Sequence, residues 1–302
     1  MILVAGGTGF VGAGIVRELA RRGKRVAVLT RDAVRALDRF PGIEVEYRQG
    51  DVRDEASLAA AVQGAETVIG SQQFPQSPVE DRKRGHTFEE VDARGTEKLV
   101  RAAQAAGVRR YVYLSGAGAA PDAAYHWFRA KWRAEAAVRE SGMTYVIFRP
   151  SWVYGPEDNA LNRFIAMSRF LPFVPLIGNA AGQRLQPVFI DDLARAVAEA
   201  VDNPAADNQT LEIGGPDVLT MKEVVRAALQ AAGRRRLLLP VPKSVMKAAA
   251  SLLQFMPGRP LTPDAVEFVT MDALADPSEV RRKLGVRLTA LRDGLGTYVG
   301  RG

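Results

Sequence analysis

The 302-residue sequence contains no cysteine and only two histidines, His86 and His126. Without cysteine, disulfide bonds and thiolate metal sites are excluded, and two histidines in no ligand-like spacing give no reason to predict a metal site. No run of about 18 or more apolar residues is present, so no transmembrane helix is predicted. The start of the chain lacks the pattern of a secretory signal, which makes the cytoplasm the expected location.

The sequence also lacks any zinc finger or basic–aromatic motif, although its net charge is +7. The basic residues are scattered in short groups, so nucleic acid is not an expected partner. Apolar residues make up 47% of the chain and charged residues 25%, which is the balance of an ordinary globular protein. This length has room for one large domain or for one domain plus a smaller lobe.

What is present is an alternation of short apolar runs with helical patterns. Six runs are predicted as strands, namely Ile2–Ala5, Arg25–Thr30, Val45–Gln49, Thr67–Gly70, Tyr111–Ser115 and Tyr145–Arg149. Helices are predicted between them at Gly12–Arg22, Glu55–Gln63, Asp92–Ala106 and Ala130–Ser141, each ended by a glycine. The strands are apolar throughout, as strands buried on both faces are. The pattern predicts an α/β fold with a doubly wound, parallel Rossmann sheet.

Two further regions follow from composition. Residues 74–90, rich in proline and charge, are predicted as a long surface loop at the ligand edge of the sheet, suited to act as a lid. Prolines become frequent after Pro150, which predicts a smaller, mostly helical substrate lobe. We therefore expect a dinucleotide-binding core at 1–155 and a lobe at 156–302, with segments at about 180–215 returning to the core.

A glycine-rich turn lies between the first strand and the first helix. Its residues, Gly6-Gly7-Thr8-Gly9-Phe10-Val11-Gly12, have the spacing G-x-x-G-x-x-G. Gly6 permits the tight turn, Gly9 allows a pyrophosphate to approach the backbone, and Gly12 lets the helix pack closely. The anion is expected at the helix N-terminus. The predicted cofactor-binding residues of this turn are Gly6, Thr8, Gly9, Phe10, Val11 and Gly12.

The end of the second strand bears on which dinucleotide binds. Arg31 stands where an acidic residue would bind the ribose hydroxyls of NAD, and an arginine there pairs with the 2′-phosphate of NADP. NADP(H) is therefore favoured, although Asp32 keeps NAD(H) open. After the third strand, Asp51 and Val52 are predicted to meet the adenine, with Asp51 accepting from the adenine amine, capping the next helix, or both.

These residues together resemble the short-chain dehydrogenase/reductase superfamily in its extended or atypical branch. Further motifs in the family's order are Tyr113-Leu114-Ser115, Lys131 with Glu135, and Arg149-Pro150-Ser151-Trp152-Val153-Tyr154-Gly155-Pro156. Within the superfamily, the chain resembles the subgroup of the dinucleotide-binding accessory subunit of respiratory complex I and its bacterial relatives. Proteins of the NAD-dependent epimerase/dehydratase type are more distant neighbours.

The resemblance implies a damaged catalytic pattern. The family uses a tyrosine as general acid/base, a lysine four residues later on the same helix face, and a serine after the fifth strand. Lys131 fits the lysine position, both for catalysis and for binding the nicotinamide ribose. However, Trp127 stands at the tyrosine position and Ala117 at the serine position.

Two hydroxyls remain as catalytic candidates, and two further residues as cofactor contacts. Tyr125 could replace the missing tyrosine only if the helix begins after it, and Ser115 is the surviving hydroxyl near the fifth strand. The resemblance also implies that the backbone near Pro150 and Val153 faces the nicotinamide. Whether Trp127 stacks on a flat substrate or packs in the interior stays open from sequence.

The lobe is poor in the polar groups that a sugar nucleotide needs. Residues 159–178 are mostly apolar, and so is Val241–Met256, which carries Lys243 and Lys247. Such a segment forms ordinary core, lines an apolar pocket or contacts a membrane surface.

Three functions are consistent with these residues. The first is an NADP(H)-dependent reductase or isomerase of an apolar small molecule, with a non-standard active site. The second is a non-catalytic NADP(H)-binding sensor or accessory protein. The third is a sugar-nucleotide epimerase or dehydratase, which Trp127 disfavours.

Overall fold

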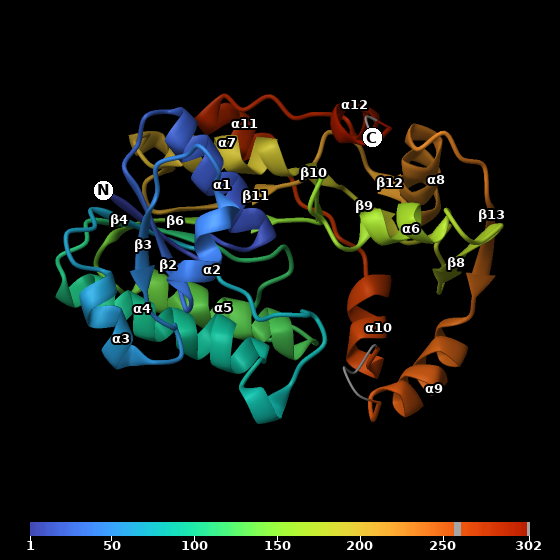
Figure 1. The fold of residues 1–302 in the computed structure, drawn as a ribbon, viewed down its shortest axis with the longest axis horizontal. Helices are drawn as coiled ribbons and strands as arrows, with labels where there is room; N and C mark the ends of the chain where they lie inside the picture. The colour runs from blue at the N-terminus through green and yellow to red at the C-terminus, as the bar shows by residue number, and fades with distance from the viewer. Residues whose placement is uncertain (257–260, 301–302) are drawn as a thin grey trace.

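A parallel sheet of seven strands forms the centre of the protein (Figure 1). The structure, a computed structural model, describes residues 1–256 and 261–300. The strand order is β11-β6-β5-β4-β1-β2-β3. The strands are β1 (Ile2–Ala5), β2 (Val26–Thr30), β3 (Glu46–Gln49), β4 (Thr67–Gly70), β5 (Arg110–Leu114), β6 (Thr144–Pro150) and β11 (Gln209–Ile213). The predicted doubly wound α/β fold is confirmed, and every predicted strand is present to within one residue at each end.

Helices cover both faces of this sheet. On one face lie α1 (Phe10–Arg21), α7 (Ile190–Ala200) and α11 (Ser278–Leu284), and on the other α3 (Glu55–Ala61), α4 (Arg94–Ala105) and α5 (His126–Arg139). The short α2 (Ala33–Ala36) follows β2. Strands β1, β2 and β4 are buried along their whole length because helices cover them from both sides. Gly23 and Gly107 end α1 and α4 in the left-handed conformation, with φ of 73° and 72°.

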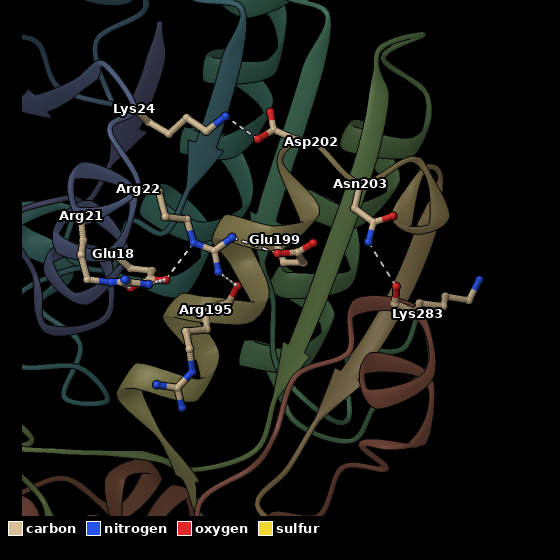
Figure 2. Close-up of polar contacts among 9 residues, drawn as sticks. All are labelled: Glu18, Arg21, Arg22, Lys24, Arg195, Glu199, Asp202, Asn203 and Lys283. Carbon is tan, nitrogen blue, oxygen red and sulfur yellow. Dashed lines mark hydrogen bonds and ion pairs between the residues drawn. The ribbon is translucent and has the colours of Figure 1, made fainter.

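Helix α7 is joined to α1 by a polar seam as well as by apolar packing (Figure 2). The Arg22 guanidinium donates to Glu18 on its own helix at 2.8 Å and to Glu199 on α7 at 2.9 Å. Lys24 forms a further ion pair with Asp202 just beyond α7. These contacts hold a late segment of the chain against the first helix, so α7 packs on the central sheet.

The remaining elements form a smaller lobe beside the carboxyl edge of the sheet (Figure 1). Its helices are α6 (Leu161–Met167), α8 (Met221–Ala231), α9 (Lys243–Leu253), α10 (Pro263–Thr270) and α12 (Leu291–Tyr298). Three short strand pairs accompany them, β7 (Val153–Tyr154) with β10 (Val188–Phe189), β9 (Arg184–Leu185) with β12 (Leu219–Thr220), and β8 (Phe173–Ile177) with β13 (Leu237–Val241). In the described part of the chain, no helix has both the length and the apolarity needed to cross a membrane.

The segment 74–90 is more structured than the predicted surface loop. Phe74 and Phe88 are almost completely buried, and their rings meet edge to face with centroids 4.9 Å apart. A short 3₁₀ turn spans Arg82–Arg84, and a π-helical segment, Phe88–Ala93, leads directly into α4. Charge and proline content predicted a loop, whereas two aromatic anchors hold both ends of the segment in the core.

Candidate functional site

Two glycines of the turn after β1 are required by the protein's own backbone. Gly6 has a φ of +78°, and a Cβ added to it would lie 2.6 Å from backbone atoms of Gln72 at the end of β4. A Cβ on Gly12 would lie 2.2 Å from the Gly6 carbonyl oxygen. The Gly9 amide closes the turn by donating to that same oxygen at 2.9 Å. The first turn of α1 is thereby packed directly against the strand end.

Gly9 is less crowded by the protein than Gly6 and Gly12. A Cβ there would meet only the Gly6 carbonyl oxygen within 4 Å, at 3.3 Å. Gly9 is the N-cap of α1, and this helix begins with no side-chain cap and no acidic residue in its first turn. The positive end of α1 is thus left for an external anion, as a dinucleotide pyrophosphate requires. The backbone of the turn from Gly6 to Gly12 therefore fits the predicted dinucleotide pyrophosphate.

The flanks of the turn are fixed by contacts that the sequence did not indicate. Thr8 is exposed, and its carbonyl oxygen accepts from the Arg39 guanidinium at 3.0 Å. Arg39 also pairs with Glu157, which Arg17 of α1 contacts at 2.8 Å. Phe10 is half-buried and packs against Gly155 beyond β7. The turn is therefore tied to the segment through which the chain enters the lobe.

At the end of β2, Arg31 and Asp32 have different surroundings. The Asp32 carboxylate caps α2, accepting from the Arg35 amide at 3.1 Å and lying 3.3 Å from the Arg35 guanidinium. Arg31 is exposed. Asp32 is thus engaged with its own helix, whereas the Arg31 side chain lies in solvent.

Asp51 lies beside Arg31 but is already held by Arg53. Its carboxylate accepts from the Arg53 amide at 2.9 Å and from the guanidinium at 2.6 Å. Although burial opposes it, these bonds and the charge of Arg31 hold the pKa of Asp51 below its usual value. Arg53 also donates to the Arg84 carbonyl at 2.7 Å, which connects this corner to the segment 74–90. The adjacent Val52 is buried.

Lys131 lies on α5 with its ammonium directed to the end of β5. It donates to the Leu114 carbonyl at 3.1 Å and lies 2.7 Å from the carboxylate of Asp92. Asp92 is completely buried in the π-helical segment, and the Lys131 side chain is 14% exposed. Burial raises the pKa of Asp92 against the pull of Lys131, while the Asp92 charge, opposed by burial, raises the pKa of Lys131.

Asp92 was not singled out from sequence. It lies 39 residues before Lys131, and only the packing of the π-helical segment on α5 brings the two side chains together. The segment Phe88–Ala93 carries three acidic residues, Glu89, Glu90 and Asp92, and no local pattern distinguishes the buried Asp92 from its two partly exposed neighbours.

The Ser115 hydroxyl belongs to a buried polar network. It lies 2.5 Å from the carboxylate of Glu135, which has no exposed surface. The Arg149 guanidinium donates to both oxygens of that carboxylate, at 2.8 and 2.7 Å. Nearby, the Ala117 amide donates to the Pro150 carbonyl at 3.0 Å, which joins the ends of β5 and β6. Pro150 and Val153 are both half-buried at this edge.

Tyr125 precedes α5, as a replacement for the missing tyrosine would need. It is the extended N-cap residue of the helix, and its hydroxyl donates to Glu267 of α10 at 3.3 Å. Its ring stacks on Trp127, with centroids 4.4 Å apart and planes 8° apart. Trp127 is only 3% exposed and also contacts Phe268 of α10. Trp127 therefore packs in the interior, with Tyr125 covering one face of its ring.

Comparison with known proteins identifies a family for most of the chain. The profile of an NAD(P)H-binding family matches residues 6–204. The chain is 32% identical to the mitochondrial NADH dehydrogenase [ubiquinone] 1 alpha subcomplex subunit 9 of Arabidopsis thaliana, over 84% of this chain and 63% of that protein. It is 30% identical to the 3 beta-hydroxysteroid dehydrogenase/Delta 5-->4-isomerase of Mycobacterium tuberculosis, over 94% of this chain and 85% of that one. The NAD(P)H azoreductase of Xenophilus azovorans is also 30% identical, over 78% and 74%.

Solved structures share the fold across almost the whole chain. An NADPH-dependent quinone oxidoreductase of Escherichia coli, solved with NADPH, matches with a TM-score of 0.75 and 19% identity, covering 98% of this chain and 99% of that one. A UDP-glucose 4-epimerase of Thermus thermophilus, solved with NAD, matches with a TM-score of 0.76 and 22% identity, covering 100% and 99%. The glycine turn, the strand order and the match to the NAD(P)H-binding family together indicate a site for a nicotinamide dinucleotide.

Proposed function

Since the chain belongs to the NAD(P)H-binding family of atypical short-chain dehydrogenases/reductases, we propose that it is an NADP(H)-dependent reductase or isomerase of an apolar small molecule. The observation that carries the proposal is the fixed ammonium of Lys131 at the carboxyl edge of the sheet. The bound cofactor supplies hydride transfer. The chain's own residues bind the cofactor, orient it and hold a positive charge near the reacting atoms.

The preference for NADP(H) is supported by the contrast between Arg31 and Asp32. The Asp32 carboxylate is occupied at the N-terminus of α2, whereas Arg31 is exposed directly after β2, the position at which the family resemblance implies a 2′-phosphate contact. An arginine–phosphate contact is a charge-assisted hydrogen bond, which is stronger than a neutral one. NADPH is therefore favoured over NADH.

We expect Arg31→Gln to weaken NADPH binding by roughly 10- to 100-fold, the loss of one charged contact, and to leave NADH binding almost unchanged. Titration of both cofactors, followed by fluorescence or calorimetry, measures this. The matched control is Arg35→Gln, because Arg35 is an exposed arginine four residues away on α2. Equal weakening of both cofactors by Arg31→Gln would contradict a 2′-phosphate contact.

The substrate class is proposed from the lobe and from two relatives. The lobe segment 159–178 is dominated by apolar side chains, and two relatives are named for steroid and azo substrates. A sugar nucleotide would need several polar groups for its second diphosphate. Tight binding of a UDP- or GDP-sugar would favour the epimerase alternative instead.

The ammonium of Lys131 is surrounded by groups of the protein itself. An ammonium group has three N–H donors, and the Leu114 carbonyl and the Asp92 carboxylate account for two. The side chain of Tyr113 also acts on this ammonium, so a ribose hydroxyl or a substrate oxygen would have to share or replace that contact. The hydroxyls of Tyr125 and Ser115 contact Glu267 and Glu135, so each must exchange a partner before it can transfer a proton.

We expect Lys131→Met to lower turnover of a carbonyl, enone, quinone or azo substrate by about 100-fold or more, in the range of a lost general acid. Because this change leaves Asp92 buried without its partner, the double variant Lys131→Met/Asp92→Asn removes both charges and controls for folding. Tyr125→Phe measures the contribution of the other candidate acid. Full activity in the double variant, measured as NADPH oxidation, would exclude a catalytic Lys131.

A non-catalytic NADP(H)-binding protein is the second candidate. It is favoured by Trp127 at the tyrosine position and by the engaged hydroxyls of Tyr125 and Ser115. Two results would together support it, namely tight NADPH binding by the unaltered protein and no turnover across the whole substrate panel.

A further inference from the structure

The most exposed apolar side chains of the lobe lie at the start of the strand pair β8–β13 and on or just after α9, which follows β13 in the chain. Phe170, just before β8, is 87% exposed, and Leu237, the first residue of β13, is 65% exposed. On α9 and just after it, Leu252 and Phe255 are 76% and 82% exposed. Burial of such side chains is favourable by about 1.5–3 kcal/mol each, so their exposure needs an explanation.

The pair β8–β13 is apolar on both of its faces. Its inner side chains, such as Val174 and Leu176, pack against Val225 and Leu229 of α8. The outer positions are paired across the strands, Phe173 opposite Leu237 and Pro175 opposite Leu239. Phe173, Leu237 and Leu239 are all exposed. The outer face is therefore an apolar surface that no described element covers.

Helix α9, which follows β13 in the chain, also carries exposed apolar side chains. Val245 and Leu252 are seven residues apart, so they lie on one side of α9, and the exposed Phe255 is in the turn just after the helix. On another side, Lys243 and Lys247 donate to Glu267 of α10 at 2.6 and 2.9 Å. These ion pairs fix the rotation of α9 about its axis and keep its apolar side turned away from α10.

The same part of the chain contains no acidic residue. Residues 159–190 and 224–263 include β8, β13 and α9, and they carry ten of the 41 basic residues and none of the 34 acidic ones. The rest of the chain therefore has a net charge of −3. Arg169 directly precedes Phe170, and Arg235 lies two residues before Leu237. Both arginines are exposed. Three of the ten basic residues pair with acidic residues just outside these segments, Lys243 and Lys247 with Glu267 and Arg184 with Asp272. The exposed Arg169 and Arg235 still place positive charge beside the exposed apolar groups.

We propose that this surface, formed by β8–β13 with Phe170 and by the apolar side of α9, docks on an anionic lipid bilayer. Exposed rings and aliphatic side chains enter the headgroup region, and Arg169 and Arg235 contact lipid phosphates. A second copy fits poorly, because a twofold contact would bring Arg169 and Arg235 of both copies to one interface without acidic partners from these segments. A nucleic acid would be attracted by the charge but would leave the apolar side chains in water.

The test is co-sedimentation with vesicles of phosphatidylcholine alone or with added phosphatidylglycerol. The protein is expected to bind only the anionic vesicles, and less tightly as salt is raised. Phe170→Ser/Leu237→Ser and Arg169→Gln/Arg235→Gln are each expected to weaken binding by roughly 10- to 30-fold. Val34→Ser is the matched control. Val34 is also an exposed apolar residue, at 76%, but it lies on α2, beside the central sheet and outside the lobe.

Four results would overturn the proposal. The first two are absence of binding to anionic vesicles and vesicle binding that all the variants retain. The third is a dimer in solution that Phe170→Ser/Leu237→Ser dissociates. The fourth is binding to a soluble polyanion such as heparin that is as tight as vesicle binding and is unaffected by the serine changes. The assay contains neither cofactor nor substrate. Its failure is therefore distinct from failure of the proposed catalytic function.

Discussion

Replacing Gly9 by aspartate is expected to abolish dinucleotide binding while leaving the protein as stable as before. Asp is a favourable N-cap residue, and the backbone of Gly9, with φ −77° and ψ 172°, suits any amino acid. The new Cβ would meet only the Gly6 carbonyl oxygen, at 3.3 Å, so a shift of a few tenths of an ångström accommodates it. Its carboxylate, however, would occupy and repel the site of the pyrophosphate.

We expect the NADPH dissociation constant of Gly9→Asp to rise by 100-fold or more, equivalent to at least about 2.7 kcal/mol. Cofactor titration and thermal unfolding together check this. Gly9→Ser adds a similar cap without charge and should lose less affinity. Gly12→Ala is the contrasting variant, because its Cβ would lie 2.2 Å from the Gly6 oxygen and should cost both binding and stability. Retained cofactor binding in Gly9→Asp would mean that the pyrophosphate does not lie at this turn.

Replacing Glu135 by alanine is expected to cost about 3–5 kcal/mol of unfolding free energy, the effect of leaving a buried charge without its partner. Glu135 is completely buried and accepts two hydrogen bonds from Arg149, one from Arg139 and one from Ser115. Without it, the half-buried Arg149 would lose its paired carboxylate and keep only the charge of Glu212, which forms no hydrogen bond with it among the contacts of the network. Urea unfolding measured in the absence of cofactor would give the change directly.

Two other substitutions make this measurement specific. Glu97→Ala removes a more exposed ion pair with Arg133 and should cost no more than about 1 kcal/mol. Ser115→Ala removes one neutral donor from the network and should cost about 0.5–1.5 kcal/mol. A loss in Glu135→Ala no larger than in Glu97→Ala would show that the network does not stabilise the fold.

The parts of the fold that were predictable are those that local sequence determines. Strands β1 and β4 match their predicted limits because each is a short apolar run bounded by residues that end strands. The glycine turn was also predictable, since its strand, glycines and helix are contiguous in the chain. Apolar periodicity and glycine spacing act over a few residues, and the central sheet is built from such pieces.

The contacts around the candidate site were less predictable because they join distant segments. Lys131 meets Asp92 from an earlier segment, and Tyr125 meets Glu267, which lies 142 residues later. Arg39 reaches both the Thr8 carbonyl and Glu157. No periodicity connects these partners, and only the packing of α5, α10 and the β7 segment around the sheet brings them together.

The path of the chain limits how the two parts of the molecule can be separated. After β7 the chain enters the lobe, returns to the central sheet for α7 and β11, leaves again for α8, α9 and α10, returns for α11 and ends in the lobe with α12. The lobe is thus an interleaved set of excursions and cannot be exchanged as one cassette. A chimera carrying the lobe of a relative would need matched junctions on each excursion, and truncation after β7 would remove β11, the edge strand of the sheet.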